Sequence, residues 1–332
     1  MARIAVIGAG SWGTALAKVL GENNHHVTVW ARRPELATEL STQQRSDVYL
    51  PGVALPPNLQ FTSNLAEAIR EANFILLATP SHGLRNVVQQ IGSLASGTIV
   101  ISSVKGIETD SLLRMSQVIA ALLGESAPVV VLSGPSLAVE VANHIPTAIV
   151  AAGNDFAAAK AVQDIFMNPY FRVYTHHDVI GVELGGALKN IIALAAGIVD
   201  GAGFGDNTKA ALMTRGLVEI TRLGAKLGAD PMTFAGLSGM GDLFVTCMSR
   251  KSRNRYVGEQ IGQGRKLPEI LNEMMMVAEG VRTTQAAYRL AQQHGVEMPI
   301  TSEVYHILFE NKDAKQAMNA LMTREAKREK FG

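Results

Sequence analysis

The fold is decided by Ile4-Ala5-Val6-Ile7-Gly8-Ala9-Gly10-Ser11-Trp12-Gly13, an apolar run that leads directly into a glycine-rich turn. The turn matches G-x-G-x-x-G, and Thr14 to Gly21 after it has the composition of a helix. The glycine pattern is weak alone, because a plain strand-to-helix turn also uses glycine. Placed between a buried strand and a helix, it predicts a turn that binds the pyrophosphate of a dinucleotide.

Similar apolar runs alternate with helix-like stretches through the first half of the chain. Continuous runs of this kind are typical of parallel strands covered by helices on both faces, and their alternation with helices predicts a doubly wound sheet. The expected strands are Ile4–Ile7, Val27–Trp30, Phe74–Ala78, Thr98–Ile101 and Val129–Leu132, with Ala148–Ala151 and Phe171–Tyr174 as further candidates.

The pattern changes near residue 179, where strand-like runs give way to stretches rich in Ala, Leu, Met, Glu and Lys. Leu212, Leu217, Ile220 and Leu223 follow helical spacing. We therefore predict an α/β, Rossmann-like, doubly wound domain over residues 1–178 and an all-α domain over residues 179–332.

Composition narrows the classes of function. The 332 residues carry a formal net charge of +1 and 47% apolar side chains, which is typical of a globular protein and lacks the global field of a nucleic-acid binder. With one cysteine, Cys247, no intrachain disulfide is possible, as in a reducing compartment. The first 17 residues superficially resemble a signal peptide, but their glycines favour the strand and turn. The apolar run Ile191–Val199 is too short to span a bilayer.

The end of the second expected strand indicates the kind of dinucleotide. NAD sites usually place an acidic residue there, whereas this chain has Trp30-Ala31-Arg32-Arg33 and no acid before Glu35. A guanidinium grips a 2′-phosphate that a carboxylate would repel. We predict that Arg32 and Arg33 favour NADP(H), with NAD(H) as a possible second cofactor. Two solvated arginines at the start of a helix are the alternative.

Two lysines are candidates for acid–base chemistry, since the histidines form no obvious catalytic set and no metal-ligand spacing is seen. Lys189 interrupts an apolar helix after Gly185-Gly186. A lysine there either acts in catalysis or extends its ammonium group to solvent. Lys105 follows an expected strand, at the carboxyl edge where open α/β sheets bind ligands, or else is an exposed loop lysine.

Two further segments carry polar groups. Asp242, in Gly239-Met240-Gly241-Asp242-Leu243, is either a functional carboxylate or a helix N-cap. Ser249-Arg250-Lys251-Ser252-Arg253-Asn254-Arg255 combines four cations with hydroxyl and amide donors. This segment suits a small phosphate, and the alternatives are a solvated basic loop and a nucleic-acid patch.

Taken together, these segments resemble the bacterial-type NAD(P)-dependent glycerol-3-phosphate dehydrogenases over nearly the whole chain. Several of the matching motifs are weak singly, but their shared order is specific to the family. The motifs are Gly8–Ala17, Ser103-Val104-Lys105-Gly106-Ile107, Leu132-Ser133-Gly134-Pro135-Ser136, Glu183-Leu184-Gly185-Gly186-Ala187-Leu188-Lys189-Asn190, Leu237–Leu243 and Ser252-Arg253-Asn254.

The resemblance implies roles for individual residues. Lys189 would be the catalytic acid and base, with Lys105 and Asp242 beside it on the substrate. The substrate and its phosphate would be held by Lys105, Gly134, Ser136, Lys189, Asp242, Ser252, Arg253 and Asn254. The cofactor would be bound by Gly8, Gly10, Ser11, Trp12, Gly13, Arg32, Arg33, Lys105, Ala138, Arg253, Val277 and Glu279.

The same resemblance implies a function and a setting. The expected reaction is the reversible reduction of dihydroxyacetone phosphate to sn-glycerol 3-phosphate, which supplies glycerophospholipid synthesis. The expected protein is cytoplasmic and homodimeric, with no metal, no nucleic-acid partner and no membrane insertion. Two other classes stay open: a related dehydrogenase of a 3-hydroxy acid or 6-phosphogluconate, and a non-catalytic NADP(H)-sensing module.

Overall fold

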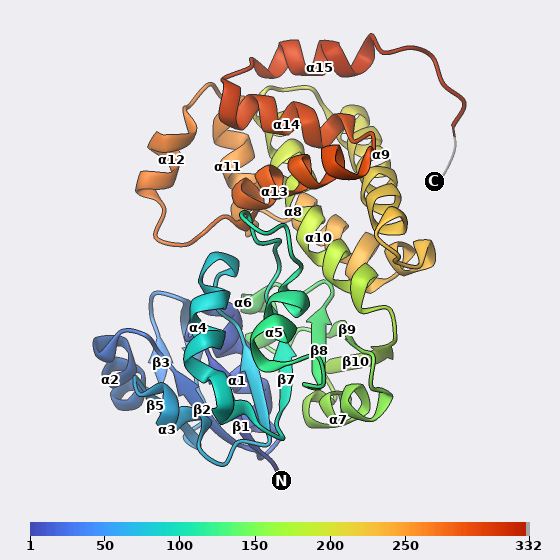
Figure 1. Ribbon diagram of the computed structural model, residues 1–332. Coiled ribbons are helices and arrows are strands. Elements are labelled where there is room, and N and C mark those ends of the chain that lie inside the picture. Colours follow the sequence, from blue (N-terminus) through green and yellow to red (C-terminus); the bar gives the residue numbers. More distant parts are fainter. Residues whose placement is uncertain (330–332) are drawn as a thin grey trace. The chain divides into compact units, whose positions relative to one another are not determined.

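The computed structural model describes residues 1–329 and divides into two compact units (Figure 1). The first unit contains Met1–Val104 and Met115–Val179, and the second contains Lys105–Arg114 and the chain from Ile180 onward. The excursion Lys105–Arg114 therefore groups with the helical unit, although sequence analysis placed it inside the dinucleotide-binding domain. Backbone contacts made far along the chain, which no local pattern encodes, cause this difference.

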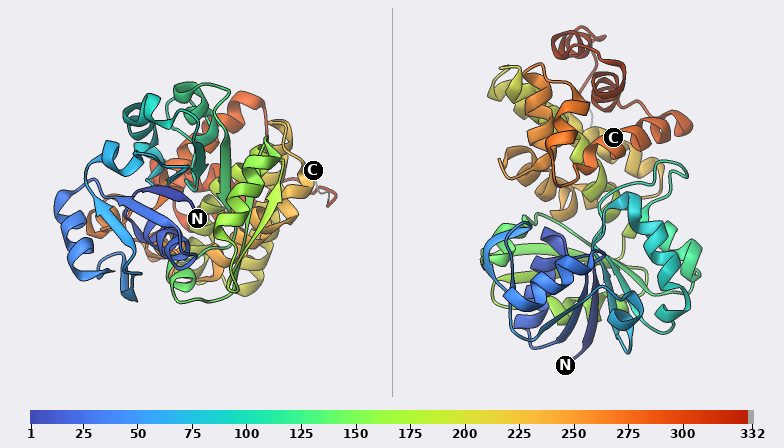
Figure 2. Two further views of the ribbon diagram at one scale, coloured as in Figure 1. Left: turned by 90° about the horizontal axis from the view of Figure 1, so that it is seen from below. Right: turned by 90° about the vertical axis from the view of Figure 1, so that its left-hand side faces the viewer.

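The first unit is built on an eight-stranded sheet in the order β10-β9-β8-β7-β6-β1-β2-β5. The pairing of β8 with β9 is antiparallel and the other pairings in this sheet are parallel. Helices cover both of its faces (Figure 2), which explains why its central strands are continuously apolar. The strands are β1 (Arg3–Ile7), β2 (His26–Trp30), β5 (Leu59–Thr62), β6 (Phe74–Leu77), β7 (Ile99–Ser102), β8 (Val129–Ser133), β9 (Thr147–Gly153) and β10 (Phe171–His176).

The doubly wound α/β prediction is confirmed, including both candidate extensions, β9 and β10. Sequence analysis missed β5 at the sheet edge, and it missed a small antiparallel pair, β3 (Arg45–Ser46) and β4 (Leu50–Ala54). These three strands are partly exposed, and polar residues, proline or glycine interrupt them, so they lack the continuous apolar run by which the others were found.

The helices of the first unit include α1, which begins directly after the glycine turn and is almost wholly buried along its middle. The helices are α1 (Ser11–Glu22), α2 (Pro34–Gln43), α3 (Leu65–Ile69), α4 (Leu84–Ile91), α5 (Met115–Leu123), α6 (Ala138–Ala142) and α7 (Phe156–Phe166), with short 3-10 turns at Ser81–Gly83 and Gly92–Ala95.

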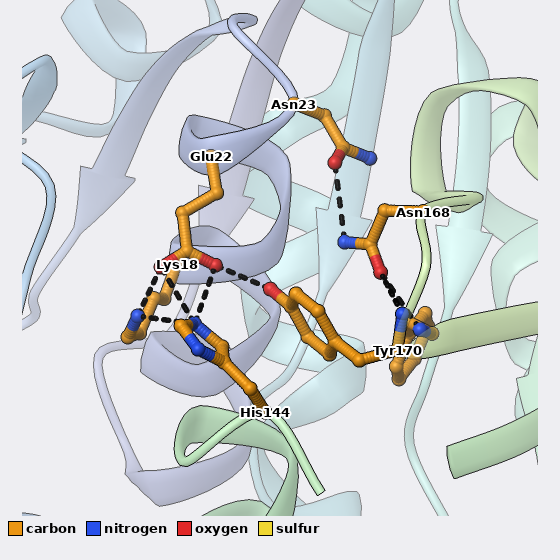
Figure 3. Close-up of polar contacts among 7 residues, drawn as sticks. Lys18, Glu22, Asn23, His144, Asn168 and Tyr170 are labelled. Atoms are coloured by element: carbon orange, nitrogen blue, oxygen red, sulfur yellow. Dashed lines mark hydrogen bonds and ion pairs between the residues drawn. The ribbon is translucent and has the colours of Figure 1, made fainter. Parts of the chain in front are cut away.

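Polar contacts fasten the carboxyl end of α1 to its neighbours (Figure 3). The Glu22 carboxylate is bonded by Lys18 of the same helix, by the Tyr170 hydroxyl, and by His144 Nε2 at 2.9 Å. His144 follows α6 and Tyr170 precedes β10, so this cluster connects three separate segments of the first unit. The position of α1, and of the turn at its start, is therefore fixed from the far end of the helix.

The second unit is helical, as predicted, and is built around α8 (Val179–Gly201). Its other helices are α9 (Asp206–Lys226), α10 (Asp242–Met248), α11 (Arg253–Gly262), α12 (Leu267–Glu273), α13 (Glu279–His294), α14 (Pro299–Glu310) and α15 (Ala314–Met322), with a 3-10 turn at Pro231–Ala235 and a π-type turn at Leu237–Gly241.

Glycines let α11 pack directly on the backbone of α8. A Cβ on Gly197 would lie 2.0 Å from the Arg255 carbonyl oxygen, and one on Gly258 would lie 2.0 Å from the Leu194 carbonyl oxygen. A Cβ on Gly201 or Gly262 would likewise lie 2.1 or 2.5 Å from a carbonyl oxygen of the facing helix. This close packing sets the distance between the helix that carries Lys189 and the helix that begins at Arg253.

Helix α8 is long and apolar enough to cross a membrane by length and composition alone, and 94% of its apolar window is buried inside the fold. The sequence argument, which counted only Ile191–Val199, underestimated this segment because it ended the apolar run at Lys189 and Asn190. Since the window is covered by other helices of its own unit, α8 is the core helix of that unit.

Candidate active site

The glycine turn lies where the winding of the sheet reverses. Strand β1 pairs with β2 on one side and with β6 on the other, so its carboxyl end lies at a topological switch point, the usual ligand crevice of such sheets. Gly8 has φ +126°, and a Cβ there would lie 2.6 Å from the Ala78 carbonyl oxygen. A Cβ on Gly13 would lie 1.9 Å from the Gly8 carbonyl oxygen. Only glycine fits either position.

The start of α1 is suited to an anion. Apart from Gly10 and its chain neighbours, no described residue has an atom within 4 Å of where a Cβ of Gly10 would stand, and the first turn of the helix contains no acidic residue. The Trp12 indole N–H is buried without a hydrogen-bond partner in that part of the chain. The backbone N–H groups of the first turn and the helix dipole favour negative charge here. These features fit the pyrophosphate of a dinucleotide.

Arg32 and Arg33 follow β2, whose register with β1 pairs Ile7 with Trp30. Both side chains are exposed, and the Arg33 guanidinium donates a long hydrogen bond of 3.4 Å to the Tyr49 hydroxyl. The structure therefore places two cations at the strand end next to the glycine turn. Their guanidinium groups face solvent, where a phosphate can reach them.

A second group of predicted residues lies beside the start of α1. Gly134 has φ +138°, and a Cβ there would lie 2.9 Å from the Ile149 Cα, so this turn also requires glycine. The Ser136 hydroxyl donates to the Gly134 carbonyl oxygen at 2.8 Å. Ala138 begins α6 and packs with Trp12 against one small apolar cluster. The segment from Gly134 to Ala138 thus borders the start of α1.

In the second unit, three predicted residues form one buried cluster. Lys189 Nζ lies 2.9 Å from Asp242 Oδ1, and Lys105 Nζ lies 2.6 Å from Asp242 Oδ2. The side chains of Lys189 and Asp242 are 8% and 2% exposed, and that of Lys105 is 19% exposed. Two ammonium groups therefore share one carboxylate. Lys189 does not extend to solvent, and Asp242 is no N-cap, because Gly241 occupies that position.

Burial changes the acidity of Lys189. Its pKa is lowered to about 8, chiefly because burial removes solvation; the charge of Asp242 opposes the shift and that of Lys105 adds to it. A lysine with a pKa near 8 is still largely protonated at neutral pH, yet it gives up its proton far more readily than an exposed lysine.

Sequence analysis missed one contact of this cluster. The Thr246 hydroxyl accepts a hydrogen bond of 2.6 Å from Lys189 Nζ and donates one of 2.7 Å to the Asp242 carbonyl oxygen. Thr246 lies four residues after Asp242, and therefore on the same face of α10. That spacing was the available signal, but it required the knowledge that a helix begins at Asp242.

The predicted phosphate segment starts α11. The Ser252 hydroxyl oxygen accepts from the Arg255 backbone N–H at 3.2 Å as the N-cap of α11, a role that sequence analysis did not assign. Arg253, at the first position of the helix, is exposed. Both stand at the end of a helix that favours anions.

Asn254 is buried and joins three helices. Its side-chain N–H donates to the Asn190 amide oxygen at 2.9 Å, and its amide oxygen accepts from the Gly280 N–H at 2.9 Å. Asn190, the neighbour of Lys189, is thus a second residue that the predicted set omitted. Of the two predicted cofactor residues near here, Glu279 begins α13 and is partly buried, and Val277 is 36% exposed.

Within residues 1–329, no group of three or more His, Cys, Asp or Glu side chains could hold a metal ion. Cys247, next to Thr246, is fully buried, and loss of solvation raises the pKa of its thiol to about 12. Cys247 is therefore no nucleophile.

Comparison with known proteins agrees with this geometry. Residues 3–159 match the family model described as NAD-dependent glycerol-3-phosphate dehydrogenase N-terminus, and residues 178–319 match the corresponding C-terminus. The glycerol-3-phosphate dehydrogenase [NAD(P)+] of Geobacter sulfurreducens is 54% identical over 332 residues, covering 99% of each chain. That of Lysinibacillus sphaericus is 53% identical over 336 residues, covering 99% of this chain and 98% of the relative.

The solved structures agree as well. The crystal structure of glycerol-3-phosphate dehydrogenase from Coxiella burnetii has a TM-score of 0.93 and 38% identity, covering 97% of this chain and 98% of the other. With two family models spanning most of the chain and relatives more than half identical over its whole length, the protein belongs to the NAD-dependent glycerol-3-phosphate dehydrogenase family.

Proposed function

We propose that the protein catalyses the reversible, NAD(P)H-dependent reduction of dihydroxyacetone phosphate to sn-glycerol 3-phosphate, and so supplies glycerophospholipid synthesis. The observation that carries the proposal is the buried cluster of Lys189, Lys105 and Asp242. Its chemistry, a poised acid beside a second cation, is what reduction of a ketone requires.

Each residue of the cluster has a distinct task. A bound nicotinamide supplies the hydride, and negative charge then develops on the carbonyl oxygen of the substrate. The Lys189 ammonium stabilises that oxygen and donates its proton, which its lowered pKa favours. Asp242 and the Thr246 hydroxyl hold Lys189 in place, and Lys105 keeps the pKa of Lys189 low and binds the substrate oxygen atoms.

The remaining predicted residues bind the two ends of the reactants. Gly8, Gly10 and Gly13 leave room for the pyrophosphate, with Ser11, Trp12 and Ala138 at its border. Arg32 and Arg33 favour a 2′-phosphate, and hence NADP(H) over NAD(H). Arg253 and Ser252, at the start of α11, bind the substrate phosphate, with Asn254 fixing that turn to Asn190. By family resemblance we also propose a cytoplasmic homodimer.

The test follows the absorbance of NADPH, which falls when dihydroxyacetone phosphate is reduced by NADPH. The absorbance rises when 3-hydroxy-acid or 6-phosphogluconate substrates are oxidised by NADP+. Lys189→Met should lower kcat by about 10³-fold or more while NADPH still binds, since the proton donor is gone. A preference for a hydroxy acid would refute dihydroxyacetone phosphate as the substrate. Near-normal turnover by Lys189→Met would refute Lys189 as the proton donor. Turnover of none of these substrates would favour an NADP(H) sensor.

A further inference from the structure

The segment Lys105–Arg114 leaves the strand β7 end and packs with the helical unit, so its backbone must be fixed there if Lys105 is to reach Asp242. A lysine side chain is a flexible four-carbon stem, and it does not hold its own ammonium group in one place. The position of Lys105 Nζ, 2.6 Å from Asp242 Oδ2, therefore depends on what holds the segment.

The segment closes on itself as a short loop. Ile107 and Arg114 face each other in an antiparallel bridge, and the Glu108 N–H donates to the Leu113 carbonyl oxygen at 3.0 Å. Ile107 is 2% exposed and belongs to the apolar core of the second unit. Lys105 is two residues before Ile107, so the bridge transmits the position of Arg114 directly to Lys105.

Arg114 in turn is joined to α8. Its guanidinium forms an ion pair with the Glu183 carboxylate, and the two side chains are only 16% and 5% exposed. Glu183 lies six residues before Lys189 on α8, which is about 9 Å along the helix axis. One rigid helix thus carries Lys189 itself and also the carboxylate that holds the loop of Lys105.

We propose that the Arg114–Glu183 ion pair is a positioning device for catalysis, which fixes the loop of Lys105 to α8 and so holds the two ammonium groups on opposite oxygens of Asp242. The inference rests on the proposed roles of Lys105, Lys189 and Asp242. A second, exposed contact also holds the loop: the Arg289 guanidinium donates a hydrogen bond of 2.6 Å to the Thr109 carbonyl oxygen.

A pH profile separates positioning from a merely structural role. The charged and titratable groups that act on Lys189 are Asp242, Lys105 and the Cys247 thiol. Since Lys105 lowers the pKa of Lys189, a displaced loop raises that pKa. Reduction needs Lys189 protonated, so the pH at which kcat for reduction declines should move upward. Lost stability alone would not move it.

The experiment compares Arg114→Met with Lys105→Met and with the two changes combined. We expect Arg114→Met to lower kcat about 10- to 100-fold and to shift the alkaline limb of the pH profile of kcat upward, as we also expect for Lys105→Met. The double variant should be no slower than Lys105→Met, because both changes remove the same ammonium group. Arg114→Lys should restore part of the activity.

Lys312→Met is the matched control, since Lys312 pairs with Glu303 at 2.6 Å in the same unit. It should lower thermal stability without moving the pH profile. If Arg114→Met behaves like this control, or if the losses multiply in the double variant, the ion pair does not position Lys105. If Lys105→Met itself is unimpaired, the proposed site fails and the inference with it. Should Arg114→Met not fold, Glu183→Gln and Arg114→Lys give the same comparison.

Discussion

At the scale of single residues, burial separates the candidate cation that suits acid–base chemistry from those that suit binding of an anion. Lys189 is buried, so loss of solvation brings its pKa to about 8. Arg32 and Arg33 are exposed at the end of β2, and a guanidinium group can bind a phosphate through paired hydrogen bonds. Lys189 is therefore suited to proton transfer, and the two arginines are suited to holding a phosphate.

The arginines lead to a prediction about cofactor choice. Arg32→Ala combined with Arg33→Ala should raise KM for NADPH about 10- to 100-fold, which corresponds to one or two lost charge-assisted hydrogen bonds. KM for NADH should change little, because NADH has no 2′-phosphate. Arg70→Ala, at another exposed arginine of the first unit, is the control for net charge. Steady-state kinetics with both cofactors measure the two KM values. An equal rise in KM for NADPH and for NADH would contradict the proposal that the arginines bind the 2′-phosphate.

At the scale of helices and strands, local sequence patterns predicted the elements that have a continuous apolar run. They missed elements and contacts that depend on segments far apart in the chain. The runs of β1, β6, β7 and β8 are apolar on both faces, and the run of β2 is interrupted only by Thr28, so each could be recognised alone. The edge strand β5 is exposed on part of its length and has no such signature.

The candidate site follows the same division. The glycine turn is local, and it could be recognised from spacing. Lys105 and Asp242 are 137 residues apart, and only the folded chain brings them together. Their roles came from family resemblance, since each residue alone had an equally good structural explanation. Thr246 and Asn190 were missed because their contacts depend on how α8, α10 and α11 pack.

The glycine contact between α8 and α11 gives a prediction at this scale. Alanine usually stabilises an exposed helix interior relative to glycine by about 1 kcal/mol. At Gly258 the added Cβ would overlap the Leu194 carbonyl oxygen of α8, so the two helices must separate. Gly258→Ala should therefore destabilise the protein by about 1–3 kcal/mol and raise KM for dihydroxyacetone phosphate, because Arg253 moves relative to Lys189.

The control for Gly258→Ala is Gly83→Ala. Among the described residues, nothing lies within 4 Å of a Cβ at Gly83, and its φ of −96° suits any residue. For Gly83→Ala, chemical denaturation should give a free energy of unfolding close to that of the wild type. A Gly258→Ala protein more stable than the wild type would mean that the helices are not held together at the glycines.

At the scale of the whole molecule, the charge is nearly balanced, with a formal net charge of +1 and a pI of about 7.9. Repulsion over the whole surface is therefore small near neutral pH, and the pH dependence of stability is set by individual buried groups. Glu219 of α9 is the prominent one: it is 3% exposed, and it accepts hydrogen bonds from the backbone N–H groups of Ile300 and Thr301 at the start of α14.

Loss of solvation raises the pKa of Glu219 from 4.5 to about 7, although the hydrogen bonds from α14 oppose the shift. The folded protein therefore binds this proton more tightly than the unfolded chain does. Its contribution to stability is full below pH 4.5 and is lost as the pH rises to about 7, on the order of 3 kcal/mol in all. Glu219→Gln cannot titrate, so this loss of stability between pH 5 and pH 8 should disappear.

The decisive quantity is the slope of unfolding free energy against pH, since the amide also changes the hydrogen bonds to α14 at every pH. Glu269→Gln, on an exposed residue of α12, should keep the wild-type slope. If Glu219→Gln keeps that slope as well, the carboxyl group is not the one that titrates across this range.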